Sequence, residues 1–428
     1  MMRRRDFLRG TLAAASCLGA GASVAATAVS RNAHVVVVGG GFGGATAAKY
    51  LRVLSKHSLR VTLVEPRESF VSLPLSNLVV GGNRQIADLT VSYDALTRRH
   101  GVAWRRTSVQ SFDATRRSLR LADGSTLAYD RLVLSPGVTL ERGAVAGLDA
   151  PALRDRLPVG WTHATESAAL HAALAAMPEG GVFAMTIPEA PLRCPPAPYE
   201  RATQAAHWLR RHNPRAKVLV FDANSEILSE ANQFQTLWAS RFGESLEYHP
   251  QFNCTEVALD AGRYAARFEL GEQVTADVLN VIPPMRAADI VVQGGLATAN
   301  GRWCDVDFLT FGSKAAPHVH VLGDAIQIAP QMPKSGQMAN QHAKVCAAAI
   351  VAELSGGQVN PEPVCTNLCF SFVSDDEAMH IAGEHRYDRV QRTMVAVPGK
   401  SDVSVQPTRD DFVRGMAWAK AIWADMLA

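Results

Sequence analysis

H-V-V-V-V-G-G-G-F-G-G, residues 34–44, is the stretch that decides the fold. It predicts a short apolar strand, a glycine-rich loop and the start of a helix that runs to Leu54. Gly39, Gly41 and Gly44 fill the three glycine positions of a dinucleotide fingerprint: the tight turn, the close approach to a pyrophosphate, and helix–strand packing. The next strand, 60–64, ends at Glu65, where an acidic residue binds ribose hydroxyls. The sequence therefore predicts a Rossmann dinucleotide-binding unit.

Two downstream segments favour FAD as that dinucleotide. H-V-H-V-L-G-D-A at 318–325 is a strand ending in Gly323 and Asp324, and it resembles the flavin-ribityl motif of two-dinucleotide-fold disulfide reductases. Y-D-R-L-V-L-S-P-G at 129–137 resembles the connecting strand of the same fold, ending at Pro136 and Gly137. The Asp324 carboxylate would accept hydrogen bonds from flavin hydroxyls.

A second phosphate loop is missing where a pyridine-nucleotide reductase would place it. G-G-V-F-A-M-T-I at 180–187 predicts a buried strand, but P-E-A-P-L-R-C-P-P-A-P-Y-E follows at 188–200. A pyrophosphate needs free backbone N–H groups and glycines, whereas these prolines remove donors and stiffen the turn. Cys194 stands where NAD(P)H would lie, so we expect electrons to enter through sulfur chemistry. A nicotinamide-linked reductase is the least favoured interpretation.

Strands and helices alternate along most of the chain, which predicts an α/β fold with parallel sheets. We expect two Rossmann-like dinucleotide-binding domains, arranged as in glutathione reductase, and a smaller C-terminal α+β domain. The FAD-binding domain comprises 33–147 and 288–359, the second Rossmann-like domain 148–287 without a nucleotide loop, and the C-terminal domain 360–428.

A helix predicted over 337–353 follows the Gly-Asp strand. Its positive N-terminal end, together with Lys334, would face an anionic flavin; the alternative for Lys334 is a solvated side chain at a turn. The last helix carries one apolar stripe, for which core or subunit packing is favoured over a membrane-surface role because basic residues are few. The stripe comprises Phe412, Met416, Ala419, Trp423 and Met426.

The N-terminus predicts export. R-R-R-D-F-L at 3–8 precedes an Ala/Gly-rich stretch and resembles a twin-arginine signal, a route for proteins that fold before export. We expect residues 1–28 to be removed and the mature protein to lie in the periplasm, without stable membrane insertion.

Charge and cysteine content exclude other classes. The chain has 43 Lys+Arg and 40 Asp+Glu, and the signal removes four arginines and one aspartate, so the mature chain is balanced. No basic patch or zinc-ligand spacing occurs, so neither nucleic acid nor a metal is expected. Cys254 and Cys346 have apolar or small neighbours and are predicted to be structural thiols, and no C-x-x-C-H haem motif is present.

Several motifs together resemble the flavoprotein subunit of flavocytochrome c sulfide dehydrogenase, over nearly the whole mature chain. The distinctive ones are A-P-L-R-C-P-P-A-P-Y-E-R-A at 190–202 and M-P-K-S-G at 332–336. The others are V-V-V-V-G-G-G-F-G-G-A-T-A-A-K-Y-L at 35–51, L-S-N-L-V-V-G-G at 75–82, V-I-P-P-M-R-A at 281–287, W-C-D-V-D at 303–307, G-D-A at 323–325 and N-L-C-F-S at 367–371.

The resemblance implies that Cys194 and Cys369 form a redox-active disulfide beside the flavin. Hydrosulfide would attack it, leaving a persulfide and a thiolate; the electron pair would pass to the flavin and then singly to a c-type cytochrome partner. Glu200 would manage the protons, or else be a surface or N-cap carboxylate. A purely structural disulfide is the alternative for the pair, and Cys365 is a rival partner that would face the same way as Cys369 on a helix.

One departure from the family concerns the flavin linkage. A family cysteine that bonds the flavin 8α-methyl group is replaced here by Leu73. Since leucine cannot form a thioether, we expect non-covalent FAD and a weaker oxidant. Two other functions stay open: a sulfide:quinone oxidoreductase at the membrane surface, and a non-catalytic flavin-bearing partner of a sulfur-oxidation complex.

Overall fold

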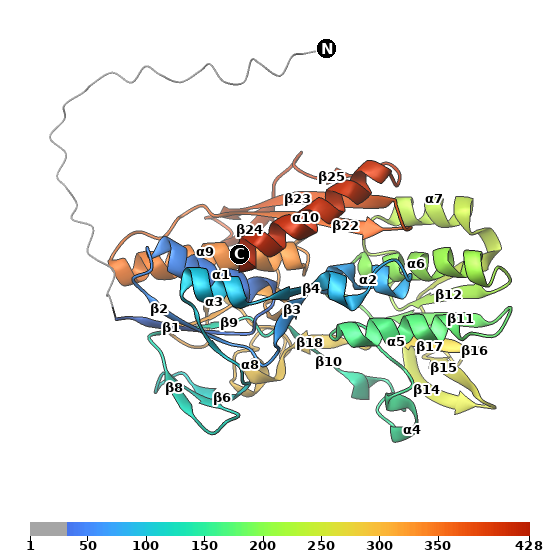
Figure 1. Ribbon diagram of the computed structural model, residues 1–428, viewed down its shortest axis with the longest axis horizontal. Coiled ribbons are helices and arrows are strands. Elements are labelled where there is room, and N and C mark those ends of the chain that lie inside the picture. The colour runs from blue at the N-terminus through green and yellow to red at the C-terminus, as the bar shows by residue number, and fades with distance from the viewer. Residues whose placement is uncertain (1–31) are drawn as a thin grey trace, which may run out of the picture.

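The structure is a computed structural model that describes residues 32–428. The predicted export signal, 1–28, lies outside the described residues. Two parallel sheets with helices lie next to each other along the long axis, and an antiparallel C-terminal sheet lies above both (Figure 1). The predicted α/β fold, with two Rossmann-like units and a smaller C-terminal α+β part, is confirmed.

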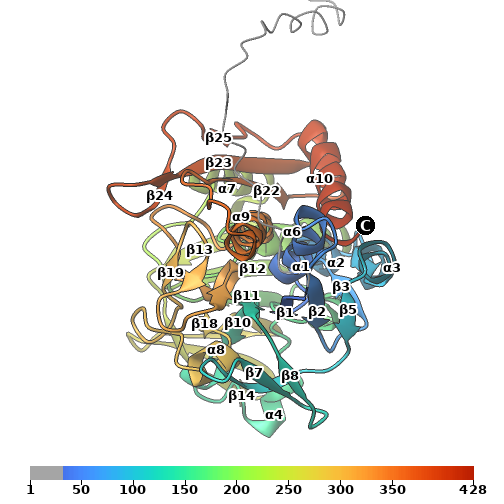
Figure 2. The same cartoon turned by 90° about the vertical axis from the view of Figure 1, so that its left-hand side faces the viewer.

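The first unit contains a seven-stranded sheet in the order β19-β20-β21-β9-β1-β2-β5, parallel from β21 to β5. Helices α1 and α9 pack together between this sheet and the C-terminal sheet, as Figure 2 shows. The strands are β1 (His34–Val38), β2 (Arg60–Val64), β5 (Ala103–Arg105), β9 (Arg131–Leu134), β19 (Val306–Asp307), β20 (Gly312–Ser313) and β21 (Val319–Val321). The helices are α1 (Phe42–Leu54), α3 (Asp94–His100), α8 (Asp289–Gln293) and α9 (Gly336–Ser355).

Smaller elements complete this unit. They are the antiparallel sheet β6 (Val109–Asp113), β7 (Ser118–Leu121) and β8 (Thr126–Ala128), the pair β3 (Ser69–Val71) and β4 (Thr90–Ser92), and helix α2 (Ser76–Val80). Val35, Val36 and Val37 of the central strand β1 are fully buried, because a parallel strand is covered on both faces.

The second unit contains a four-stranded parallel sheet in the order β13-β12-β11-β17. The chain enters it after β10 (Val138–Leu140) and leaves it through β18 (Met285–Ala287), and these two strands pair antiparallel. Its strands are β11 (Val182–Ile187), β12 (Lys217–Asp222), β13 (Leu246–Pro250) and β17 (Val278–Val281). Its other elements are helices α4 (Pro151–Arg154), α5 (Ala164–Ala175), α6 (Ala197–His212) and α7 (Ala231–Arg241), and the antiparallel strands β14 (Cys254–Asp260), β15 (Arg263–Phe268) and β16 (Gln273–Ala276).

The C-terminal part is an antiparallel sheet covered by the last helix (Figure 2). Its elements are β22 (Val364–Phe372), β23 (Ala378–Asp388), β24 (Thr393–Ala396), β25 (Asp402–Val403) and α10 (Arg409–Leu427). The apolar stripe of α10 packs inward: Ala419 and Met426 are fully buried, and Phe412, Met416 and Trp423 are partly buried against core clusters. The stripe is therefore core packing.

Candidate active site

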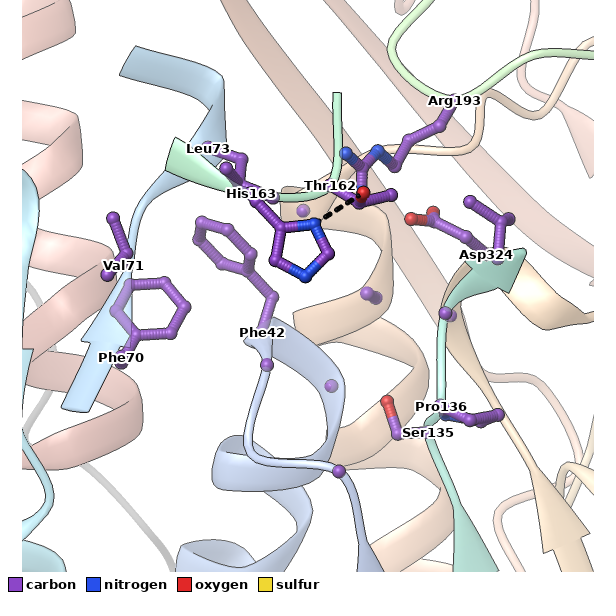
Figure 3. A pocket seen from close by; sticks show the side chains of 18 of the residues that line it. Phe42, Phe70, Val71, Leu73, Ser135, Pro136, Thr162, His163, Arg193 and Asp324 are labelled. Atoms are coloured by element: carbon purple, nitrogen blue, oxygen red, sulfur yellow. Dashed lines mark hydrogen bonds between the residues drawn. The ribbon is translucent and has the colours of Figure 1, made fainter. Parts of the chain in front are cut away.

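A cavity of about 490 Å³ extends from the glycine loop of the first unit to Cys194 of the second. Figure 3 shows side chains from both units around it, with Phe42 and Phe70 on one side and Arg193 and Asp324 on the other. Its length joins the fingerprint loop to the proline-rich segment, so a single elongated ligand can contact both.

The glycine loop has the geometry that a pyrophosphate requires. A Cβ on Gly39 would lie 2.4 Å from the Ser135 carbonyl oxygen, and one on Gly44 would lie 1.7 Å from the Gly39 carbonyl oxygen. A Cβ on Gly41 would meet nothing within 4 Å among the described residues, because Gly41 borders the cavity. Two glycines are thus required by packing, and the third leaves room for a ligand at the N-terminus of α1.

Glu65 lies at the end of β2 and lines the cavity, as the sequence predicts. Its carboxylate accepts hydrogen bonds from the Gly40 backbone N–H (2.6 Å) and from Arg67 Nε (2.9 Å). The Arg67 guanidinium and these hydrogen bonds outweigh burial and lower the pKa of Glu65. The side chain is ionised and fixed beside the loop, where a ribose would lie.

The opposite wall fits a flavin. Pro136, Gly137, Gly323 and Asp324 all line the cavity. Asp324 Oδ1 is buried and has no hydrogen-bond partner among the described residues, so it is an acceptor that a ribityl hydroxyl would satisfy. Burial raises its pKa, although nearby Arg193 and Lys334 oppose this effect. Asp324 thus lies where it could bind a ribityl hydroxyl of FAD, and the other three residues form the wall around it.

The second unit offers no equivalent dinucleotide site among residues 32–428. Helix α6 begins directly after Pro195 and Pro196. Asp222 ends β12, where Glu65 ends β2, but it is fully buried and its carboxylate oxygens are already hydrogen-bonded. The donors are Tyr199 Oη (2.7 Å), Tyr248 Oη (3.0 Å), and the backbone N–H (2.9 Å) and Nδ2 (2.7 Å) of Asn224. A nucleotide ribose would find no free acceptor at this carboxylate.

Cys194 and Cys369 lie together although they come from different parts of the chain. Both are free thiols in the structure, and they interact electrostatically. Burial raises the pKa of Cys194 well above its usual value, and neighbouring Cys369 adds to the effect. Burial also raises the pKa of Cys369 to about 11. Cys194 has a φ of +56°, a region that non-glycine residues rarely occupy and that is common at functional sites.

Cys365, the alternative partner for the disulfide, does not lie on the helix expected for it. It and Cys369 lie on strand β22 rather than on a helix. Four residues of strand separate them by about 13 Å along the chain, and Cys365 is fully buried. The strand runs over its whole length against β23, from Val364 to Phe372.

Glu200 lies six residues beyond Cys194, in the first turn of α6, and is only 2% exposed. Its Oε2 accepts a hydrogen bond from Asn77 Nδ2 (3.1 Å), and its Oε1 accepts one from the Phe372 backbone N–H (3.1 Å). Burial raises its pKa to about 8, against the effect of these hydrogen bonds. It is therefore neither a surface nor a capping carboxylate, and it interacts electrostatically with both cysteines.

Lys334 is buried, not solvated, but its ammonium does not line the cavity. Nζ donates hydrogen bonds to the carbonyl oxygens of Asp324 (2.9 Å) and Ile326 (2.6 Å) and lies 3.6 Å from the centre of the Trp303 ring. Burial lowers its pKa to about 7. The Lys334 ammonium faces backbone oxygens behind Asp324, so Lys334 supports the cavity wall from behind. Gly336, at the start of α9, lines the cavity itself.

Leu73 lines the cavity with Pro74, on the side opposite Asp324 in Figure 3.

Three further residues were missed by the sequence analysis, although two of them stand in the quoted motifs. Arg193 lines the cavity beside Cys194, and Asn77 joins Glu200 to Arg201, whose Nε donates to Asn77 Oδ1 (3.1 Å). Glu230 interacts electrostatically with Cys369, and no sequence motif marked it.

Residues 32–428 lack two features, a membrane-spanning helix and a cluster of metal ligands. No helix there has the length and apolar character needed to cross a bilayer. No group of three or more His, Cys, Asp or Glu side chains there is arranged to hold a metal ion.

Three family models match successive parts of the chain. Residues 33–160 match the pyridine nucleotide-disulphide oxidoreductase model. Residues 167–283 match the central part of the sulfide dehydrogenase [flavocytochrome c] flavoprotein chain, and residues 361–427 match the flavin-binding part of flavocytochrome c sulphide dehydrogenase.

Individual relatives agree with these models. The sulfide dehydrogenase [flavocytochrome c] flavoprotein chain of Chlorobaculum thiosulfatiphilum is 67% identical over 46 residues, which are 11% of this chain and 94% of that sequence. The mitochondrial sulfide:quinone oxidoreductase of Dictyostelium discoideum is 25% identical over 294 residues, 68% of this chain and 64% of that protein.

Solved structures support the fold. The sulfide:quinone oxidoreductase of Aquifex aeolicus superposes with a TM-score of 0.74 at 20% identity, covering 92% of this chain and 91% of that one. A ferredoxin reductase of Rhodopseudomonas palustris gives a TM-score of 0.65 at 17% identity, covering 90% and 93%. With the flavin-binding and central models and the 67% identical relative in agreement, the chain belongs to the flavoprotein family of flavocytochrome c sulfide dehydrogenase and is an FAD-dependent oxidoreductase.

Proposed function

We propose that this protein is a periplasmic sulfide dehydrogenase that oxidises sulfide through a Cys194–Cys369 disulfide and passes electrons to a c-type cytochrome. The observation that carries the proposal is that Cys194, which lines the elongated cavity, interacts electrostatically with Cys369 and with the buried Glu200. The family membership supports sulfide as the substrate.

The two sulfur atoms supply the substrate chemistry. Hydrosulfide attacks one sulfur of the disulfide; a new S–S bond forms in a persulfide while the Cys194–Cys369 bond breaks and its electron pair stays on the other sulfur as a thiolate. Arg193 lies in the cavity next to Cys194 and interacts with it electrostatically. Its positive charge attracts the hydrosulfide anion and stabilises the thiolate.

Glu200 handles the substrate proton. Its raised pKa allows the carboxyl to exchange a proton near neutral pH. As a carboxylate it takes the proton from the attacking sulfur species at Cys194 or Cys369, and the Asn77 amide holds it in position. Because Asn77 also accepts from Arg201, its amide orientation is fixed.

FAD would be held without a covalent bond by the glycine loop, Glu65 and Asp324. When bound, it supplies an acceptor that takes two electrons at once and releases them one at a time. Leu73 lines the cavity but carries no nucleophile, which supports non-covalent binding.

The acceptor and the location are inferred together. The flavocytochrome c relatives favour a cytochrome acceptor, and the 3–8 motif favours twin-arginine export. Quinone is the second candidate acceptor, favoured by the similarity to the D. discoideum sulfide:quinone oxidoreductase.

The test uses purified, FAD-loaded protein under anaerobic conditions. Sulfide should bleach the flavin absorbance, and oxidised horse-heart cytochrome c should then restore it faster than decyl-ubiquinone does. Faster recovery with decyl-ubiquinone would transfer the assignment to the quinone class. The absence of bleaching in protein with intact disulfide would contradict sulfide oxidation and favour a non-catalytic flavin-bearing partner.

A further inference from the structure

A second buried carboxyl group, Glu230, lies near Cys369. It is 6% exposed, it directly precedes α7 of the second unit, and it interacts electrostatically with Cys369 of the C-terminal sheet. Glu200 interacts with it as well. The cysteine site therefore has two buried carboxyl groups, of which the mechanism above uses one.

The contacts of Glu230 leave one oxygen free. Oε2 accepts a hydrogen bond of 2.7 Å from Ser371 Oγ. Ser371 follows Cys369 by two residues on β22, so both side chains lie on the same face of the strand. Oε1 is buried and has no partner among the described residues. A buried oxygen without a partner is costly for a fixed structural carboxylate, whereas a group that binds and releases a proton needs such a position.

The backbone of Glu230 is also unusual. Its φ is +56°, in the left-handed region that non-glycine residues rarely adopt. Strain of this kind persists where the surrounding structure fixes it, often at functional sites. Glu230 is therefore both buried and strained, and it is hydrogen-bonded to β22, the strand that carries Cys369.

Glu200 cannot pass a proton to its own hydrogen-bond partners. Asn77 Nδ2 and the Phe372 backbone N–H both donate to it, and neither can accept a proton. Since Glu200 is almost fully buried, a proton taken from the substrate needs another acceptor nearby. Glu230 is the neighbouring carboxyl group that raises the pKa of Glu200 through its charge.

Beyond Glu230, titratable groups continue to the surface. His380 of β23 and Asp411 of α10 both interact electrostatically with Glu230. His380 Nδ1 lies 3.0 Å from Asp411 Oδ1, and its Nε2 lies 3.1 Å from Asp402 Oδ2. The Asp402 side chain is 74% exposed. The two carboxylates raise the pKa of His380 despite its burial, so it readily holds a proton.

We propose that Glu230 is the second proton carrier of the enzyme: it receives the substrate proton from Glu200 and passes it through His380 to Asp402 at the surface. The inference rests on the proposed function. The persulfide S–H bond breaks as an O–H bond forms on Glu200, and this proton then moves to the Glu230 carboxylate through a bridging water. The electron pair of the S–H bond remains on sulfur, so the relay moves protons only.

The test compares E230Q with E226Q, which alters an exposed carboxylate on the same loop. Stopped-flow absorbance follows flavin bleaching by sulfide, and phenol red in weak buffer follows proton release. In wild type we expect bleaching and proton release to occur together, with a rate that rises with pH as both carboxyl groups ionise, Glu230 through about 7 and Glu200 through about 8. E230Q keeps an acceptor for Ser371 but is expected to bleach about 10²-fold more slowly and to lose the part of the rise near pH 7. E226Q should match wild type.

The possible outcomes distinguish failure of the proton relay from failure of the proposed function on which it rests. If sulfide does not bleach wild type, the proposed function and the relay both fail. If wild type is bleached and E230Q has the same rate and pH profile, the relay alone is wrong. If E230Q loses FAD or melts at a lower temperature, H380Q carries the test, since it leaves Glu230 in place: delayed proton release supports the relay, and unchanged release overturns it.

Discussion

The backbone N–H of Cys194 donates a hydrogen bond of 2.7 Å to the carbonyl oxygen of Lys334. Arg193 and Lys334 also form an isolated parallel β-bridge. The bridge joins the proline-rich segment of the second unit to the loop before α9 of the first. It holds the Cys194 thiol at the cavity wall and turns the Lys334 side chain toward the carbonyl oxygens behind Asp324.

Replacement of either cysteine should abolish the sulfide reaction. C194S and C369S remove one sulfur of the proposed disulfide, so hydrosulfide has no S–S bond to attack. We expect both variants to bind FAD but to show no sulfide-driven bleaching in anaerobic titration. C365S is the matched control, because Cys365 is fully buried four residues before Cys369 on β22. Full bleaching of C194S would contradict the disulfide route.

E200Q should change both activity and stability with pH. In wild type the bleaching rate should rise as Glu200 ionises through about pH 8, and E200Q should lose this rise and react about 10²-fold more slowly. The pKa of Glu200 is raised on folding from its ordinary value of 4.5. Between 4.5 and 8 the folded state therefore holds more protons than the unfolded state, and stability falls as pH rises.

The same substitution should thus raise the melting temperature at pH 9 and have little effect at pH 4. Thermal melts of wild type and E200Q at these two pH values check the sign. A higher melting temperature of wild type at pH 9 would show that the buried carboxylate is stabilised by contacts beyond those described.

Two glycine substitutions should separate folding from FAD binding. A Cβ at Gly44 would lie 1.7 Å from a backbone oxygen, so G44A should destabilise the first unit and give little folded protein. A Cβ at Gly41 has free space on the protein side, so G41A should fold but bind FAD at least about tenfold more weakly, since the methyl group occupies the cradle for the pyrophosphate. Circular dichroism and FAD titration of the apoprotein distinguish the two effects.

D324A should weaken FAD binding without loss of fold. A hydrogen bond to a charged acceptor contributes about 1.5–3 kcal/mol, which corresponds to a rise in Kd of about tenfold to a hundredfold. Fluorescence titration of the apoprotein with FAD measures it. An unchanged Kd would mean that the orphaned Oδ1 of Asp324 does not contact the ribityl chain.

L73C should permit a covalent flavin link. Wild type should release all its flavin into the supernatant on acid precipitation, because Leu73 cannot form a thioether. Leu73 lines the cavity, so a cysteine there should retain part of the flavin in the pellet, visible as fluorescence after gel electrophoresis. Wild-type protein that retained flavin in the pellet would contradict non-covalent binding.

Local sequence patterns were enough to predict much of the fold. The valine run of β1, the glycine loop and the acidic end of β2 act within one βαβ unit, so neighbours along the chain fix their conformation. The proline-rich segment likewise predicted a second unit without a nucleotide loop, and the saturated Asp222 agrees with it. The bounds of β22, in contrast, depend on tertiary structure, because its pairing partner β23 decides where the strand begins.

What the sequence determined by itself was the fold class, the candidate flavin-binding residues of the first unit and the family resemblance, because each depends on short-range spacing. Only the tertiary structure brought Glu200 and Glu230 to the cysteines and directed the Lys334 ammonium onto backbone oxygens and Trp303. The contacts of Glu200 and Glu230 with β22 join segments more than a hundred residues apart, and those of Lys334 depend on its burial. Desolvation and electrostatic coupling arise from the three-dimensional packing, and no local motif encodes them.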